Sequence, residues 1–556
     1  MSAAQRPPSQ VVIGLDVGTT AVKAVAFGLA SAWRRMAIRE YPLLEPAPGR
    51  HEQNPETILA ATTAALTDCV DAVSDAEVLA ISLSAAMHGL IALDATMHPI
   101  TPLVTWADSR ARDEAKSLRE SGMAAELHRR TGTPVHPMTP LTKLMWFSRH
   151  DRQTWAAARW WVGLKDYLLW ALTGTLTTEL SSAGGTGMLN MATRTWSLTA
   201  LELAGISAWQ LPPILPTTAT LKLAAVPAAR IGLPAGTPVV VGAADGPLGN
   251  LGTGAISPGV AGLSLGTSGA VRTVVPEPQV DDRHTLFCYA LTESAWVVGG
   301  PISNGGLVVR WAARALAPDL LRPSPGQHHD EALLELAASA PAGSDGLVML
   351  PYLVAERAPL WDPDLPGAVL GLREEHTRAH LVRAAVEGVC LQLRAILDQL
   401  DRLRPVTAVR ATGGTFRSAL WREVMAAVLA RPLFVVGDAE DTALGAAMLA
   451  LLALGRASRL GDTVAQLSPP DAQGPAPVAA GHELVTTYAQ LRASLPGLIG
   501  ALAPVAGALV PATPVTNVSA PPATGGLARP TPAIGPPQTA SNVGRDRPAT
   551  RPREAQ

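Results

Sequence analysis

The chain has 556 residues, of which 47% are hydrophobic and 16% charged, and its formal net charge is −2. A single hydrophobic core stops growing at roughly 250–300 residues, so this length predicts at least two domains. The nearly balanced charge argues against binding of nucleic acid, or of an anionic membrane, through a broad positive field. The three cysteines are far apart and lack the spacing of a metal site, which favours a reducing cytoplasm over secretion.

Neither end of the chain predicts a membrane segment. The N-terminal stretch MSAAQRPPSQ is polar, unlike a signal peptide. The longest uncharged stretch begins near Ser494, but its repeated Pro and Gly make it a poor membrane span. Residues 503–556 are rich in Pro and Ala, and we expect them to form a disordered tail. We therefore expect a cytoplasmic protein that does not enter a membrane.

Two similar stretches, far apart in the chain, each predict a β-hairpin. The first is GLDVGTTAVKAV (residues 14–25) and the second is GLSLGTSGAVRTV (residues 262–274). In both, a short apolar run is broken by a glycine that permits a tight turn, and a second apolar run follows. A single repeat at this distance predicts two related domains rather than a solenoid.

The remaining periodic segments alternate between strand and helix patterns. We expect a strand over residues 78–85, a helix with one buried face over 380–400, and a strand, a glycine turn and a helix beginning near Ser418. Residues 441–455 predict a helix that is apolar nearly all round and ends at Gly455. This alternation is typical of an α/β protein, with domains that we place at 11–255 and 256–492.

The glycine turns suit the binding of phosphate, because they offer backbone N–H groups and hydroxyls to an anion. One turn from each domain could close on a polyphosphate. The first hairpin has Asp16 where the second has Ser264, and a lone acid among such donors could hold Mg²⁺. A third turn, in RATGGTFRSALW, could approach a nucleotide. Each turn alone is also compatible with an ordinary hairpin or strand–helix connection.

One carboxylate, Asp245, ends the apolar run VVVGAA and is followed by a glycine-rich stretch. At a strand end with room beside it, such a group can take the proton of a substrate hydroxyl. Taken alone, Asp245 could equally be a turn residue. No partner acid or base stands next to it in the sequence, and phosphoryl transfer does not require a catalytic triad.

These motifs, in this order, resemble the FGGY family of carbohydrate kinases, over residues 11–492. The resemblance rests on GLDVGTT, SLGTSGA, ATGGTFRSALW and DTALGAAMLA, and on the longer stretches SLSAAMHGLIALD, TWADSRA, RTGTPVHPMTPLTKLMW and GGPISNGGLVVRW, which are most similar to the gluconokinases of that family. It implies two ribonuclease-H-like domains of the actin/Hsp70 type with a cleft between them. It also implies ATP as the phosphoryl donor, and Mg²⁺.

The resemblance assigns roles to individual residues. Asp245 matches the catalytic base and Asp16 the magnesium-linked acid. Positions that match ATP contacts are Thr19, Thr20, Lys23, Gly266, Thr267, Gly306, Gly414 and Ser418. Positions that match sugar-binding segments are Met87, His88, Gly89, Trp106 and Asp108. Many members have Asn or Gln near the place of Asp108, so its contact is left open.

The resemblance implies phosphorylation of D-gluconate to 6-phospho-D-gluconate. Alternatives are a kinase of another sugar such as xylulose, or a non-catalytic nucleotide-dependent clamp of the same fold. Gluconate has a carboxylate that a cation or other donor should meet. Candidates inside the matching stretches are Arg110, His136, Lys143, Lys165 and Asn304. Members of the family are often dimers or tetramers, so the resemblance allows a homo-oligomer.

Overall fold

The computed structural model describes residues 8–29, 31, 33–321, 331–436, 441–467, 472–473, 485–491 and 493–494. All of them belong to one unit of the chain, residues 1–501. The tail predicted over residues 503–556 lies outside the described residues. Among the helices that the structure describes, none combines the length and the apolar composition that a bilayer crossing requires.

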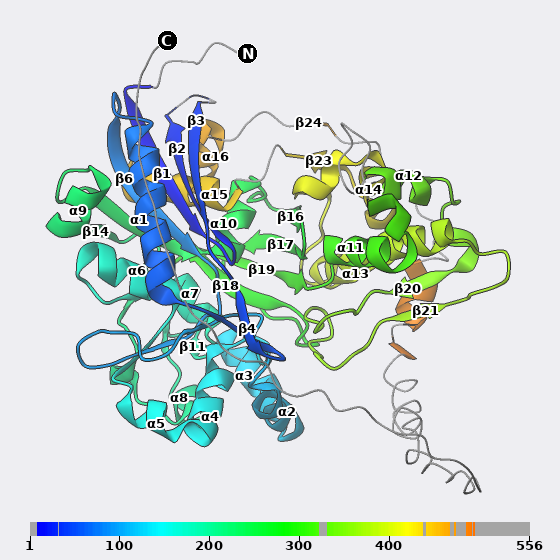
Figure 1. The fold of residues 1–556 in the computed structure, drawn as a ribbon, viewed down its shortest axis with the longest axis horizontal. Coiled ribbons are helices and arrows are strands. Elements are labelled where there is room, and N and C mark those ends of the chain that lie inside the picture. Colours follow the sequence, from blue (N-terminus) through cyan, green and yellow to red (C-terminus); the bar gives the residue numbers. More distant parts are fainter. Residues whose placement is uncertain are drawn as a thin grey trace, which may run out of the picture. The chain divides into compact units, whose positions relative to one another are not determined.

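The first hairpin forms the centre of a six-stranded sheet with the strand order β14-β15-β6-β1-β2-β3 (Figure 1). Its strands are β1 (Gln10–Val17), β2 (Ala21–Gly28), β3 (Arg34–Glu40), β6 (Glu77–Ala85), β14 (Thr220–Lys222) and β15 (Pro238–Ala244). β1, β2 and β3 pair antiparallel in sequence order, whereas β1, β6 and β15 pair in parallel. The predicted hairpin and the strand over residues 78–85 are confirmed.

The second hairpin forms the centre of a seven-stranded sheet with the order β18-β19-β17-β16-β22-β23-β24. Its strands are β16 (Val260–Leu265), β17 (Gly269–Val275), β18 (Phe287–Thr292), β19 (Ala295–Ile302), β22 (Ala408–Thr412), β23 (Leu433–Val435) and β24 (Ala472–Gln473). β16, β17 and β19 pair antiparallel, and β16, β22 and β23 pair in parallel. This repeats the strand pattern of the first sheet, so the internal repeat reflects two domains of the same α/β type.

Two helices pack between the sheets: α10 (Asp245–Gly252), which follows β15, and α15 (Asp441–Ala453). Their apolar side chains share one buried cluster with residues of β1, β6 and β18. Their backbones approach closely, since a Cβ on Gly445 would lie 2.0 Å from the carbonyl oxygen of Leu248. α15 is buried on nearly every side, as its uniform apolar composition predicts, and Gly455, with φ of +67°, follows its end.

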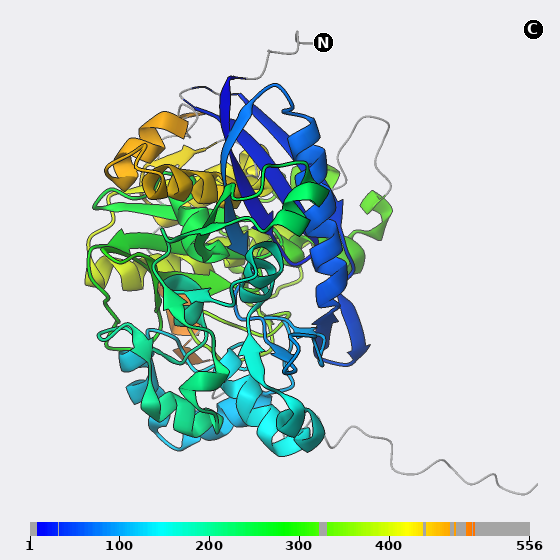
Figure 2. The same cartoon turned by 90° about the vertical axis from the view of Figure 1, so that its left-hand side faces the viewer.

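The other faces of the sheets are covered by helices on the outside. α1 (Pro55–Asp71) lies along the first sheet and begins where the Asn54 side chain accepts a hydrogen bond from the Thr57 N–H (Figure 2). The predicted helix over 380–400 is part of α13 (Arg378–Leu403), which packs in the core of the second domain. Other helices of this domain are α11 (Gly306–Leu316), α12 (Glu331–Ala338), α14 (Ala419–Leu429) and α16 (Leu460–Leu467). Strands β20 (Val348–Leu350) and β21 (Ala368–Leu370) form a separate pair.

A large helical insertion follows β6, and part of it gathers at the lower end of the view in Figure 1. Its helices are α2 (Arg112–Glu120), α3 (Met123–Thr131), α4 (Pro140–His150), α5 (Arg152–Ala157), α6 (Leu164–Thr173), α7 (Leu180–Gly185), α8 (Leu198–Ala204) and α9 (Ala225–Ile231). Short strands accompany it: β4 (Leu44–Ala47), β5 (Arg50–Gln53), β7 (Ile91–Leu93), β8 (Leu103–Val104), β9 (Trp160–Val162), β10 (Thr178–Glu179), β11 (Leu189–Asn190), β12 (Thr195–Trp196) and β13 (Ile214–Leu215). Helices α2, α3, α4 and α8 share a hydrophobic core of their own, whereas α6 and α9 pack in the core of the first sheet.

Candidate active site

A cavity of about 210 Å³ lies between the two domains. The first domain lines it with Thr19, Met87, His88, Trp106, Asp245 and Gly246, and the second with Ser264, Ser268, Gly269, Arg272, Phe287, Tyr289, Pro301 and Arg357. Both hairpin turns therefore reach the same cavity, as their phosphate-binding pattern suggested. We call it the central cavity.

The backbone of β15 delivers Asp245 to the central cavity. The pairing of β15 with β6 shifts register between Val240 and Ala243, which marks a β-bulge. Gly242 in this bulge has φ of +73°, and a Cβ there would lie 1.7 Å from the carbonyl oxygen of Leu83. Only glycine fits this position. The strand then ends at Ala244, and Asp245 begins α10.

Burial raises the pKa of the Asp245 carboxyl. Arg272 and the backbone N–H of Gly246, which donates to Oδ1 at 2.8 Å, oppose this effect. A carboxylate of raised basicity that is still accompanied by positive charge is suited to accept a proton near neutral pH. The position at the junction of β15 and α10 agrees with the strand end expected for Asp245.

Two further carboxylates face this region. Asp16 lies near the end of β1, opposite Lys23 on β2, and burial together with the charge of Asp245 raises its pKa to about 7. Asp441, the first residue of α15, adds to this repulsion and accepts a 2.6 Å hydrogen bond from the Thr412 hydroxyl. The sequence analysis did not single out Asp441, although it begins the apolar helix that carries one of the family motifs.

Of the five residues predicted to bind the sugar, three line the central cavity. His88 has φ of +64°, and its Nδ1 lies 2.7 Å from the carbonyl oxygen of Gly185. Burial lowers the pKa of His88 to about 3, so its ring is neutral at physiological pH. The Trp106 ring faces the guanidinium of Arg357, with Cζ 4.9 Å from the ring centroid. Met87, His88 and Trp106 line the central cavity.

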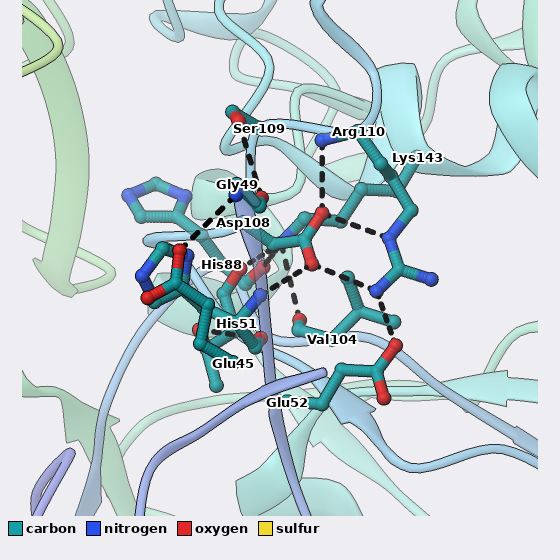
Figure 3. A network of polar contacts seen from close by, with 11 residues as sticks. Glu45, Gly49, His51, Glu52, His88, Val104, Asp108, Ser109, Arg110 and Lys143 are labelled. Atoms are coloured by element: carbon teal, nitrogen blue, oxygen red, sulfur yellow. Dashed lines mark hydrogen bonds and ion pairs between the residues drawn. The ribbon is translucent and has the colours of Figure 1, made fainter. Parts of the chain in front are cut away.

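Gly89 and Asp108 are not among the described residues that line the central cavity. Gly89 is buried, and Asp108 accepts hydrogen bonds from the backbone N–H groups of His51 and Arg110 and from the Arg110 side chain (Figure 3). The Asp108 carboxylate is therefore fully engaged inside the first domain. A sugar contact for either residue stays a prediction.

A second cavity, of about 820 Å³, lies within the second domain. Five of the positions matched to ATP contacts line it, namely Gly266, Thr267, Gly306, Gly414 and Ser418. Its wall carries charges of both signs, from Arg310, Arg417, Glu331 and Glu335, and an aromatic surface from Trp421. Of the other three positions, Thr19 lines the central cavity, whereas Thr20 and Lys23 are among the described lining residues of neither cavity.

The turn between β16 and β17 stands between the two cavities. Ser264, Ser268 and Gly269 line the central cavity, and Gly266 and Thr267 line the second one. This turn therefore separates the central cavity from the second one. The sequence indicated the turn but not its place between two binding spaces.

The five residues considered as partners of a substrate carboxylate all have other partners. None of them is among the described residues that line the central cavity. Arg110 pairs with Asp108 and Glu52, and Lys165 pairs with Glu179. The remaining three contact backbone groups: His136 with Glu356, Lys143 with His88, Val104 and Thr105, and Asn304 with Leu353 and Val354.

The cations of the central cavity are instead Arg272 and Arg357, both half-buried. Arg272 Nη1 donates to Ser264 Oγ at 3.2 Å, while its buried Nε has no hydrogen-bond partner. Arg357 donates to Ser303 and to the carbonyl oxygen of Ile302. Burial lowers the pKa of each to about 10, so both remain charged at neutral pH.

Comparison with known proteins shows the family to which this chain belongs. The model of the FGGY carbohydrate kinases, N-terminal domain, matches residues 11–252, and that of the C-terminal domain matches residues 261–454. The chain belongs to the FGGY family of carbohydrate kinases, and the resemblance seen in the sequence is confirmed.

Among its relatives, the chain is 38% identical to a gluconokinase of Bacillus subtilis over 450 residues, which cover 80% of this chain and 88% of that protein. It is 30% identical to a xylulose kinase of Escherichia coli, over 82% of this chain and 92% of that protein. Two solved structures from Lactobacillus acidophilus, a gluconate kinase and a xylulose kinase, each superpose with a TM-score of 0.80 at 32% identity, over 90% of this chain and 99% of theirs.

Proposed function

We propose that this carbohydrate kinase transfers the γ-phosphoryl group of MgATP to the C6 hydroxyl of D-gluconate. The observation that carries the proposal is that Asp245 shares the central cavity with two guanidinium groups, those of Arg272 and Arg357. A sugar acid needs both features at once, a base for its hydroxyl and a cation for its carboxylate. The 38% identity to a gluconokinase supports the same substrate.

Asp245 would act as the general base. Phosphoryl transfer depends mainly on positioning and on electrostatic stabilisation, so one carboxylate that takes the hydroxyl proton is sufficient. The N–H groups and hydroxyls of the two hairpin turns would hold the phosphates in line with that hydroxyl. Thr19 from the first turn offers a hydroxyl to the central cavity, and Thr267 from the second turn offers one to the second cavity.

The carboxylates near the central cavity fit a Mg²⁺ ion that arrives with ATP. Burial and the charges of Asp245 and Asp441 raise the pKa of Asp16, and a divalent cation would relieve that repulsion. The described residues contain no group of three His, Cys, Asp or Glu side chains that could hold an ion unaided. Asp16 would therefore hold the ion together with phosphate oxygens and water, as Mg²⁺ commonly requires. The ion would neutralise charge on the transferring phosphoryl group.

The proposal is tested by a coupled assay of the full chain and of Arg272→Met with gluconate, xylulose, ribulose, glycerol and erythritol. We expect gluconate to be the preferred substrate of the wild type. Loss of a half-buried charged partner for the carboxylate should lower kcat/KM for gluconate by about 100-fold and that for neutral sugars much less. Arg314→Met, at an exposed arginine of the same domain, is the control and should behave as wild type.

Other outcomes would contradict the proposal. If the wild type preferred xylulose, the substrate would be a neutral sugar and not gluconate. An equal loss for all sugars in Arg272→Met would remove the carboxylate argument. If no sugar were phosphorylated although ATP bound, the chain would be a nucleotide-dependent clamp. In Asp245→Asn, we expect ATP binding to persist and turnover to be abolished, because the amide cannot accept the proton.

A further inference from the structure

Lys143 is a fully buried lysine whose ammonium group donates its hydrogen bonds to backbone carbonyls. It lies on α4 with 0% of its surface exposed. Its Nζ donates to the carbonyl oxygens of His88 at 2.6 Å, Thr105 at 2.7 Å and Val104 at 3.2 Å (Figure 3). An ammonium has three N–H donors, so these three carbonyls use its whole capacity.

The three carbonyls belong to two separate segments that both lead to the central cavity. Leu90 and Val104 form an antiparallel bridge. The Leu90 N–H donates to the Val104 carbonyl oxygen at 3.1 Å, and the Val104 N–H donates to the Leu90 carbonyl oxygen at 2.9 Å. On one side of this bridge the two segments diverge, one toward His88 and the other toward Trp106. Lys143 holds both segments at the point where they separate.

The charge of Lys143 has a cost that packing alone does not explain. Burial lowers the pKa of the Lys143 ammonium to about 7, and the charge of Asp108 opposes that effect. An apolar side chain of similar length would fill the same volume without this desolvation penalty. A cation at this position supplies N–H donors to three carbonyl oxygens whose partial charges repel one another, which an apolar side chain cannot do.

One of the gathered groups belongs to a strained residue. His88 has φ of +64°, a conformation that costs a non-glycine residue about 1 kcal/mol or more unless its surroundings hold it. Its carbonyl is held by Lys143 and its ring by the carbonyl oxygen of Gly185. Both ends of His88 are therefore fixed, and the residue keeps its ring at the wall of the cavity.

We propose that Lys143 is a positioning residue that sets the sugar-binding segments around His88 and Trp106 relative to each other. It does so from behind the cavity wall, without touching the substrate. The inference rests on the proposed function only in taking the central cavity as the sugar site, and it holds for any sugar. Lys143 thus serves the sugar pocket as a clamp on its backbone rather than as the cation that meets a carboxylate.

The test compares Lys143→Met, Lys143→Gln and the control Lys116→Met, whose side chain is 61% exposed on α2. For whichever sugar the wild type phosphorylates best, we expect Lys143→Met to raise the sugar KM by at least about tenfold, because charge-assisted hydrogen bonds are lost. The Kd for ATP, measured by calorimetry on the same sample, should not change. Lys143→Gln, which keeps two N–H donors, should recover part of the loss.

The proposal that Lys143 positions the sugar-binding segments would be overturned by an unchanged sugar KM in Lys143→Met. It would also be overturned by an equal rise of the sugar KM and the ATP Kd. If Lys143→Met does not fold, the same comparison of sugar and ATP constants in Lys143→Gln decides the matter. Calorimetry of sugar binding shows whether Lys143 affects the sugar site even if gluconate is not the substrate, or if no sugar is phosphorylated. A failure of the positioning role of Lys143 and a failure of the proposed gluconate kinase activity are therefore seen in different measurements.

Discussion

The indole Nε1 of Trp106 donates a hydrogen bond of 2.9 Å to the hydroxyl of Thr19. This bond joins the two kinds of motif that the sequence indicated separately, a sugar segment and a phosphate-binding turn. Gln53 strengthens the junction, because its Nε2 donates to the backbone carbonyl of Thr19 at 2.7 Å. These hydrogen bonds connect the wall of the sugar cavity to the first hairpin turn. A substitution in the wall should therefore also change the position of the turn.

Trp106→Phe tests this link. The phenyl ring can still face Arg357, but the hydrogen bond to Thr19 is lost. A neutral hydrogen bond contributes about 1 kcal/mol, so kcat/KM for the sugar should fall about fivefold. Because Thr19 belongs to the hairpin, the KM for MgATP should rise as well. Steady-state kinetics with each substrate varied in turn measures both effects.

Trp170→Phe is the matched control for this prediction. Trp170 lies on α6, contacts Tyr167 with ring centroids 5.9 Å apart, and is not among the described lining residues of the central cavity. Its substitution should leave both constants unchanged. A response of Trp106→Phe that is confined to the sugar constant would show that the two motifs act independently.

The parts of the fold that sequence reasoning predicted are those with strong local signals. The two hairpins have a glycine turn between apolar runs, and α15 is apolar on every side, so short-range periodicity was enough. The helical insertion lacks one repeating pattern, and its short strands pair with distant partners, as β7 does with β9. Such pairing is decided by tertiary packing, which a local pattern does not contain.

The candidate site was predictable to the same extent. Of the residues carried by motifs, Asp245, Met87 and Thr267 line the two cavities, whereas Thr20, Lys23, Gly89 and Asp108 are among the described lining residues of neither. Cations were harder, because a sequence shows that a residue is charged but not what it contacts. Arg272 had one signal, since it aligns with Lys23 in the sequence repeat, although in the strands Lys23 lies opposite Asp16 and Arg272 opposite Gly262. Arg357 had none, because contacts with residues before α11 set its position in an irregular segment.

The close approach of α10 and α15 leads to a prediction about the base. In Gly445→Ala the new Cβ would meet the carbonyl oxygen of Leu248 at 2.0 Å, so the helices must separate. Overpacking of this kind costs about 1–3 kcal/mol of unfolding free energy, measurable by urea denaturation. Since Asp245 begins α10, a shift of that helix by about 1 Å would also lower kcat by as much as 100-fold.

Gly461→Ala is the matched control for the helix contact. Gly461 also lies in a helix, α16, but a Cβ there would meet nothing within 4 Å. Alanine is favoured over glycine in a helix by about 0.5–1 kcal/mol, so this variant should be as stable as the wild type or more stable. Equal effects of the two substitutions would show that the separation of α10 from α15 does not depend on the missing side chain.

Buried His136 leads to a prediction about stability and pH. Burial, aided by the charges of Arg357 and Arg119, lowers its pKa to about 3, and its side chain is only 4% exposed. The unfolded chain takes up a proton on this group below about pH 6.5, whereas the folded chain does not until about pH 3. The stability that the neutral ring contributes is therefore present above pH 6.5 and is lost as the pH falls toward 3. At pH 5 the loss amounts to about 2 kcal/mol.

Urea denaturation of the wild type and of His136→Gln over the range from pH 7 to pH 4 measures this loss. Glutamine does not titrate, so the free energy of unfolding of the variant should fall less steeply with decreasing pH, whatever its stability at pH 7. His98→Gln, at an exposed histidine, is the control and should keep the slope of the wild type. Parallel curves for the wild type and His136→Gln would mean that His136 accepts its proton in the folded chain as readily as in the unfolded one.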